Sequence, residues 1–274
     1  MKRLMMLLGL TLFLPGAGQA QTNENKLPPT DYGAGYKIVI IHQHQKHTPG
    51  PEDDPFGNGP IKLDRTYPLI ASPPTPDTQA FDTEMQRRAA QWWAAMDAPK
   101  DNSTAADPVT DYSLDCEPVG LPPPADSPSP DNARMLPGVI SMACGTYVYP
   151  HGAGHGGGEY WGFNWIVSAH RDITASDVFA PNTSWRAALT AAANAIRPAA
   201  PSWGLQKLDF TDPSHWVLER GGLGLSYSYW QFAGYIDGGC GYFALIPWAK
   251  LAPYLRKDGI VPRADWSATA MPEN

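Results

Sequence analysis

The sequence predicts an α+β fold in which antiparallel sheets are each packed by one or two helices, arranged as two small consecutive modules. Two observations lead to this prediction. Strand-like runs with alternating apolar and polar residues follow one another along the chain. Only single helical segments interrupt these runs, whereas a regular alternation of strand and helix would indicate a doubly wound parallel sheet. No internal repeat is present.

The first 20 residues have the pattern of an export signal. Lys2 and Arg3 precede an apolar run at 4–14, and a small-residue cleavage site ends at Ala20. We therefore expect residues 1–20 to be a signal peptide cleaved after Ala20, and the mature chain to be periplasmic or secreted. The apolar run is too short to cross a bilayer, and no later stretch reaches the necessary ~20 apolar residues, so we expect no transmembrane anchor.

The segment 21–60 is predicted to hold one short strand at 36–42. A polar, proline-broken start at 21–31 is expected to be mobile, and proline and glycine indicate a loop at 48–60. A further strand is predicted at 61–70.

A helix follows the prolines near position 75. Apolar residues recur there at the spacing of one helix face, with Asp77 or Thr78 as a cap: Phe81, Met85, Ala89, Trp92 and Met96. Trp92 and Trp93 are adjacent, so they cannot point the same way, and one of them is expected to stay partly exposed or to pack under a loop.

Residues 112–120 and 139–149 are predicted to pair as an antiparallel hairpin that completes a first module at 61–150. A register that sets residue 120 opposite residue 140 also sets Cys116 opposite Cys144. Exported proteins form disulfides, so we expect a Cys116–Cys144 bond, with Cys240 left over.

A second module is predicted at 151–258, followed by a tail at 259–274. It begins with a glycine-rich turn at 152–158 that leads into a strand, and it then alternates strands and helices. The predicted elements are a strand at 159–167, a helix at 185–197, strands at 215–219 and 223–229, and a last helix from Pro247 to near Gly259.

Four short motifs occur in a fixed order in this chain. They are Tyr149 with Gly152-Ala153-Gly154-His155, then Thr174 with Asp177-Val178-Phe179, then Tyr229-Trp230-Gln231, and finally Ile246-Pro247-Trp248. Together they resemble the extracytoplasmic part of the lysozyme-sensing anti-sigma factors of the RsiV type and the non-catalytic part of the peptidoglycan deacetylase PdaC, which carry a tandem of domains of unknown function.

The resemblance spans about residues 61–257, and the predicted second module resembles the RsiV C-terminal domain. It implies an extracytoplasmic location and a target that is either a lysozyme-like muramidase or peptidoglycan. The anti-sigma role itself requires a membrane span and a cytoplasmic arm, and neither is expected in this chain.

The candidate binding residues are aromatic rings and imidazoles in and around these motifs: His155, Tyr160, Trp161, Trp165, His170, Tyr229 and Trp230. Exposed indole and phenol rings serve sugar stacking and protein recognition equally well. The competing interpretation is that most of these rings fill a core. A ring-lined groove would indicate a glycan ligand, whereas a flat acidic patch would indicate a basic protein.

The chain is acidic, with a formal charge of −7 that becomes −9 once Lys2 and Arg3 are removed. Acidic proteins repel nucleic acid, so we expect no nucleic-acid partner. The charge would steer the chain toward a cationic partner such as a basic lysozyme-like protein. Ordinary solubility is the competing explanation.

No metal or cofactor is predicted. His42 and His44 lie two residues apart and share one face of a strand, and His47 could join them only where the strand ends, but no cysteine or carboxylate lies at a fixed offset. His151 and His155 lack the glutamate of a helical zinc-protease motif, and no nucleophile elbow is present.

We therefore expect an exported binding protein of the cell envelope rather than an enzyme. One alternative is a hydrolase of cell-wall polymer with a site around His155, Glu159 and His170. The other is a structural envelope factor without a ligand.

Overall fold

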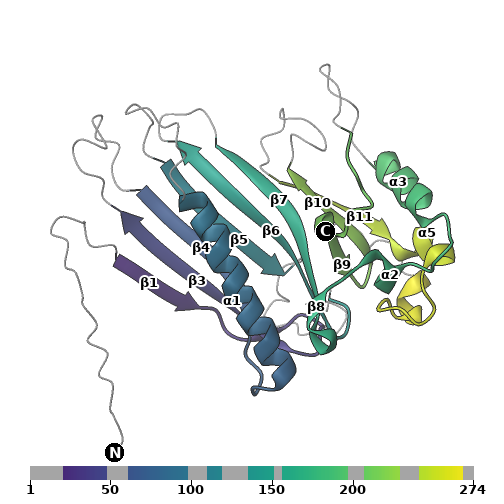
Figure 1. Cartoon of the computed structure of the whole chain (residues 1–274), viewed down its shortest axis with the longest axis horizontal. Coiled ribbons are helices and arrows are strands. Elements are labelled where there is room, and N and C mark those ends of the chain that lie inside the picture. The colour runs from purple at the N-terminus through teal and green to yellow at the C-terminus, as the bar shows by residue number, and fades with distance from the viewer. Residues whose placement is uncertain are drawn as a thin grey trace, which may run out of the picture.

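The computed structural model describes residues 21–47, 61–97, 110–118, 135–150, 156–196, 207–228 and 241–267. It confirms the α+β class. One large mixed sheet is packed by a long helix, and a small antiparallel sheet carries most of the shorter helices (Figure 1). Within the described part of the chain, no helix is both long and apolar enough to cross a membrane.

The large sheet has eight strands in the order β1-β3-β4-β5-β6-β7-β8, with β2 paired to β3. The strands are β1 (Gln21–Lys26), β2 (Thr30–Asp31), β3 (Lys37–His47), β4 (Ile61–Ile70), β5 (Thr110–Pro118), β6 (Val139–Pro150), β7 (Gly157–Ile166) and β8 (Arg171–Asp172). Segment 21–31 was expected to be mobile. That expectation is wrong, because β1 pairs with β3 over six residues and β2 pairs with it over two.

One strand pair departs from the antiparallel pattern. β4 and β5 are parallel, and the long helix α1 (Pro76–Asp97) lies between them in the chain. Parallel neighbours need a crossover connection of this kind, whereas a hairpin turn joins only antiparallel ones. The other neighbours in the large sheet are antiparallel.

The helix α1 covers one face of the large sheet with the predicted apolar stripe. Phe81, Met85 and Ala89 are almost fully buried. The Phe81 ring makes edge contacts with Phe163 and Trp165 of β7, at centroid distances of 6.3 and 6.5 Å. The cap is Thr75 rather than Asp77 or Thr78. Its hydroxyl accepts the Thr78 N–H at 3.2 Å, because Pro76 fills the first helical position.

The hairpin of β5 and β6 has the predicted register. Cys116 lies opposite Cys144, and the two form a disulfide with a Cα–Cα distance of 4.1 Å. Both cysteines are buried. A structural disulfide is typical of proteins in oxidising compartments, so the bond indicates an extracytoplasmic protein.

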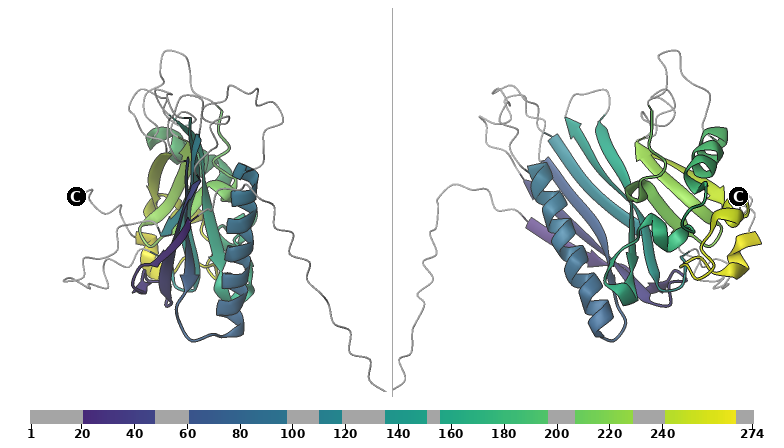
Figure 2. Two further views of the ribbon diagram at one scale, coloured as in Figure 1. Left: turned by 90° about the vertical axis from the view of Figure 1, so that its left-hand side faces the viewer. Right: turned by 45° about the vertical axis from the view of Figure 1, so that its right-hand side comes forward.

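The small sheet has the order β11-β10-β9, with β9 (Trp216–Glu219), β10 (Gly222–Ser228) and β11 (Gly241–Pro247). It packs with α3 (Trp185–Ile196) and α5 (Trp248–Leu251) around a second hydrophobic core. Figure 2 shows α1 and the small sheet on opposite sides of the large sheet.

Buried polar side chains join the two sheets where β6 and β7 meet β9. The Ser141 hydroxyl donates to the Asn164 side-chain oxygen at 2.7 Å, and the Asn164 amide donates to the Trp216 carbonyl at 2.6 Å. The Leu218 N–H in turn donates to the Ser141 hydroxyl at 2.7 Å. Each group is satisfied, so this junction fixes the position of β9 without the desolvation cost of an unpaired polar group.

Two C-terminal elements differ from the prediction. Strand β11 was not predicted, because 241–247 follows a glycine-rich stretch and ends at Pro247, which was expected to begin the last helix. The last helix was expected to reach Gly259, but α5 is only four residues long and a 3-10 turn at Ala252–Tyr254 follows it. Pro253 removes a backbone donor there, so an α-helix cannot continue.

The predicted division into 61–150 and 151–258 falls between β6 and β7. These two strands pair over ten residues in the large sheet. The division stays a prediction.

Candidate functional site

A cavity of about 1220 Å³ lies beside β7. Its described lining comes from the C-terminal half of α1, from β5, β6 and β7, and from two short segments at 172–175 and 212–214. Ligand pockets in proteins commonly measure 300–1,000 Å³, so this one is large enough for a ligand of several linked rings.

Aromatic rings form one wall of the cavity. Trp161 of β7 and Trp92 of α1 are both partly exposed and lie with their ring centroids 5.2 Å apart. Phe163, two residues along β7 on the same face, is buried against Phe81. Two indoles therefore lie at the border between core and cavity.

An ion network positions Arg88, which also lines the cavity. Its guanidinium donates to Glu84 at 2.6 Å and to Asp172 at 2.7 Å, and it lies 5.1 Å from the centre of the Phe163 ring. Hydrogen bonds from Arg87 and Arg88 lower the pKa of Glu84 to about 2, so this carboxylate stays ionised. Arg88 is thus neutralised by two carboxylates.

The floor of the cavity includes bare backbone at the start of β7. A side chain on Gly158 would overlap the carbonyl of Thr146, so glycine is required there for strand packing. Gly157 is different, since nothing lies within 4 Å of the position that its Cβ would take. Gly157 therefore contributes open space to the cavity.

The carboxylate of Glu159 faces this space. Glu159 is exposed and lines the cavity, and it has no hydrogen-bond or ion-pair partner in the described part of the chain. Asp212, which also lines the cavity, accepts the Ser214 N–H at 2.9 Å. The described lining holds one cation, Arg88, and the three carboxylates of Glu159, Asp172 and Asp212.

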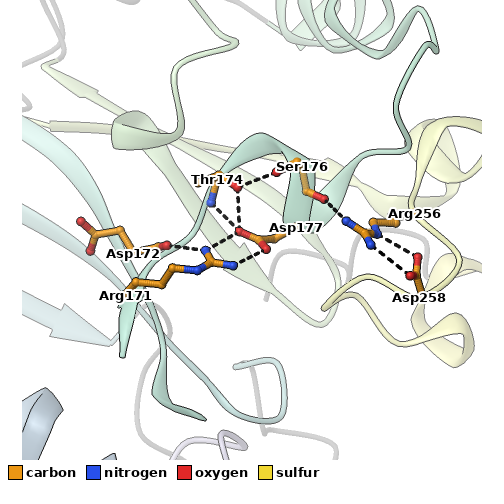
Figure 3. Close-up of polar contacts among 7 residues, drawn as sticks. All are labelled: Arg171, Asp172, Thr174, Ser176, Asp177, Arg256 and Asp258. Carbon is orange, nitrogen blue, oxygen red and sulfur yellow. Dashed lines mark hydrogen bonds and ion pairs between the residues drawn. The ribbon is translucent and has the colours of Figure 1, made fainter. Parts of the chain in front are cut away.

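The threonine-aspartate motif beside the cavity has a structural role (Figure 3). Thr174 caps the short helix α2 (Ala175–Val178), and its N–H and hydroxyl donate to Asp177 at 2.7 and 2.8 Å. Arg171 makes a two-pronged contact with the same carboxylate at 2.7 and 2.8 Å. The hydrogen bond from Arg171 lowers the pKa of Asp177 to about 2.

The end of this motif anchors the second core. Phe179 is buried, stacks on Trp185 at 4.5 Å and meets the edge of Trp216 at 5.6 Å. A second ion pair, between Arg256 and Asp258, holds the neighbouring segment, and Arg256 also donates to the Ser176 carbonyl (Figure 3).

The predicted binding residues separate in the structure. Trp161 lines the cavity, but Trp165 is 5% exposed and belongs to the core under α1. Neighbours along a strand point to opposite faces, and the Tyr160 ring accordingly lies against Gly145 rather than beside Trp161. His155, Tyr229 and Trp230 lie outside the described residues.

His170 lies in a separate, smaller hollow of about 400 Å³ near the start of α1. It has a left-handed conformation, with φ of 52°, and its Nε2 is 2.7 Å from the Asp77 carboxylate. Glu159 and His170 therefore line different hollows.

The N-terminal histidines lie on β3. His42 bonds to the Thr66 hydroxyl at 3.1 Å, and His44 pairs with Asp64. Among the described residues no group of three or more His, Cys, Asp or Glu side chains is arranged to hold a metal ion.

Sequence reasoning missed the contributions of α1 to the cavity. Trp92 was assigned to the core stripe, and Arg88 was not singled out. The signal available was the adjacent pair Trp92-Trp93, of which one ring was expected to stay partly exposed or to pack under a loop.

Comparison with known proteins identifies the fold. No protein-family model matches the chain, and no curated protein matches it. Among solved structures, the chain is similar to a DUF3298 family protein from Pseudomonas aeruginosa PAO1, with a TM-score of 0.52 and 13% identity over 84% of this chain and 99% of that one. A DUF3298 family member from Bacteroides fragilis gives a TM-score of 0.46 and 11% identity, over 88% of this chain and 94% of that one.

Proposed function

We propose that this chain is an exported, non-catalytic binding module of the bacterial envelope, and that its cavity binds a segment of peptidoglycan glycan. The observation that carries the proposal is the pair of partly exposed indoles, Trp92 and Trp161, on the wall of a cavity of about 1220 Å³. The apolar face of a pyranose ring packs on an indole, and a cavity of this size accommodates more than one sugar.

The wider setting agrees with this proposal. The buried Cys116–Cys144 disulfide favours an envelope location, and the fold is that of a DUF3298 family protein. The motifs that resemble the RsiV and PdaC domains support a peptidoglycan-related ligand. A ring-lined groove, rather than a flat acidic patch, is the feature that distinguishes a glycan from a basic protein as the target.

Gly157 offers a direct test because it lines the cavity and has free space above its backbone. Gly157→Leu should fold normally and fill the site. We expect the dissociation constant for soluble peptidoglycan fragments, measured by calorimetry, to rise at least about tenfold, equivalent to 1.4 kcal/mol. The melting temperature should stay at the wild-type value.

A matched control is Gly221→Ala, because Gly221 lies away from the cavity and its Cβ would make only an ordinary contact with Leu245. It should leave both binding and melting temperature unchanged. Equal affinity of Gly157→Leu and wild type would exclude the cavity as the site, and no binding of fragments by the wild type would refute the glycan proposal.

A basic muramidase is the second candidate ligand, favoured by the formal charge of −9 that remains after the signal is removed. Association driven by that charge should slow steeply as salt rises, since exposed charges more than about 8–10 Å apart are screened at physiological ionic strength. Stacking of sugars on indoles should respond little to salt. Titration of a basic lysozyme at low and physiological salt therefore separates the two candidates.

A further inference from the structure

We infer that the cavity prefers glycans that carry free amino groups, and that Glu159 is the residue that contacts the ammonium. This inference rests on the proposed glycan function and adds the chemical class of the sugar. It follows from the charge of the lining and from the position of Glu159 beside the indole wall.

The charge balance of the described lining favours a cationic ligand. Arg88 is its one cation, and Glu84 and Asp172 already neutralise that guanidinium at 2.6 and 2.7 Å. Glu159 and Asp212 have no cationic partner in the described part of the chain. A neutral ligand would leave both carboxylates uncompensated, whereas an ammonium group would offset one of them at close range.

The geometry of β7 sets this carboxylate beside the stacking surface. Gly157, Glu159 and Trp161 are separated by two residues each, so they lie on one face of the strand at intervals of roughly 6–7 Å. Contact of Trp161 with Trp92 of α1 shows that this is the face that meets the cavity. A sugar ring measures about the same as one such interval.

A ring stacked on Trp161 therefore brings a substituent at its edge within reach of the Glu159 carboxylate. Thr146, the cross-strand neighbour of Glu159, adds a hydroxyl at the same level, and Gly157 leaves room for the next sugar.

The amino and N-acetyl forms of one sugar separate this inference from the general proposal. At mildly acidic pH the amine is protonated, whereas the N-acetyl group is neutral. We expect the mature wild-type protein to bind a glucosamine tetramer about tenfold more tightly than an N-acetylglucosamine tetramer, the range of one charge-assisted hydrogen bond. Calorimetry at about pH 6 measures both constants.

Glu159→Gln should reduce the ratio of the two affinities to about one. The control is Glu117→Gln, since Glu117 is an exposed acid of β5 that does not line the cavity, and this variant should keep the wild-type ratio. Binding of both tetramers with equal affinity, or a preference that survives in Glu159→Gln, would overturn the inference while the glycan proposal stands. Absence of binding to either tetramer and to peptidoglycan fragments would overturn both.

Discussion

Replacement of Asp177 by asparagine tests whether the threonine-aspartate motif stabilises the fold. The change keeps the shape of the side chain but removes the charge and one of the two acceptor oxygens that Arg171 and Thr174 use. Lowering the pKa from 3.8 to about 2 corresponds to at most roughly 2.5 kcal/mol. Arg171 is 46% exposed, so solvent screening reduces that contribution to about 1 kcal/mol.

The capping-box hydrogen bonds from Thr174 are among the causes of this pKa shift, so their loss is already included. We therefore expect Asp177→Asn to lower the free energy of unfolding by about 1 kcal/mol at pH 7. For a chain of this size that corresponds to a fall in melting temperature of about 2–4 °C. Urea unfolding followed by circular dichroism measures the difference.

The pH dependence of this difference has a definite sign. The folded-state pKa of Asp177 is depressed, so its contribution is fully present above the unfolded value of 3.8 and is lost as the pH falls toward about 2. The gap between wild type and Asp177→Asn should therefore close between about pH 5 and pH 2. A gap of equal size at pH 7 and at pH 2 would refute the reasoning.

Asp258 provides the matched control. A hydrogen bond from Arg256 lowers its pKa to about 2 as well, but its side chain is 74% exposed. We expect no measurable change for Asp258→Asn, because exposed pairs contribute little to stability. A loss of stability as large as that of Asp177→Asn would show that burial does not distinguish the Asp177 ion pair from the Asp258 ion pair.

Two further variants test how the sheets are joined and closed. Gly162→Ala should lower the free energy of unfolding by about 3 kcal/mol or more, or prevent accumulation of folded protein, because the added Cβ would overlap the Trp216 carbonyl. Urea unfolding measures the change, with Gly157→Ala as the control. A Gly162→Ala variant as stable as the wild type would contradict the expectation. Removal of both Cys116 and Cys144 should cost about 3–4 kcal/mol, since the bond closes a loop with a sequence separation of 28. An unchanged urea midpoint in the double alanine variant would contradict that expectation.

Local sequence patterns predicted the elements whose partners lie nearby in the chain. The strand at 61–70 agrees with β4, and the apolar stripe after the prolines agrees with α1. The hairpin register was assumed, as the one that sets residue 120 opposite residue 140, and the structure has that register, with Cys116 opposite Cys144. For the strand and the helix, alternation or helical spacing indicates the buried face.

Elements that depend on distant partners were not predictable in the same way. The polar strand β1 forms because β3 offers a free edge, and nothing in its own composition indicates a strand. The parallel pairing of β4 and β5 follows from where α1 returns the chain, which local patterns do not encode.

The candidate site shows the same limit. Alternation on β7 places Trp161, Phe163 and Trp165 on one face and Tyr160 on the other, but it does not show how far along that face the core extends. The structure assigns Trp165 to the core, where it contacts Phe81 near the start of α1. Trp161 contacts Trp92 near the end of α1 and stays partly exposed. Trp92 enters the site from a helix about 70 residues away in the chain, a contact that only the tertiary fold creates.

Fluorine NMR of the mature protein with 5-fluorotryptophan tests the central claim most directly, because each of its ten tryptophans reports on its own surroundings. Single Trp→Phe variants assign the resonances. On titration with soluble peptidoglycan fragments, we predict that the signals of Trp92 and Trp161 shift together and saturate, while those of Trp216 and Trp248, both fully buried in the second core, stay in place. Saturable binding that moves other tryptophans but leaves Trp92 and Trp161 unchanged would contradict the assignment of the cavity as the glycan site.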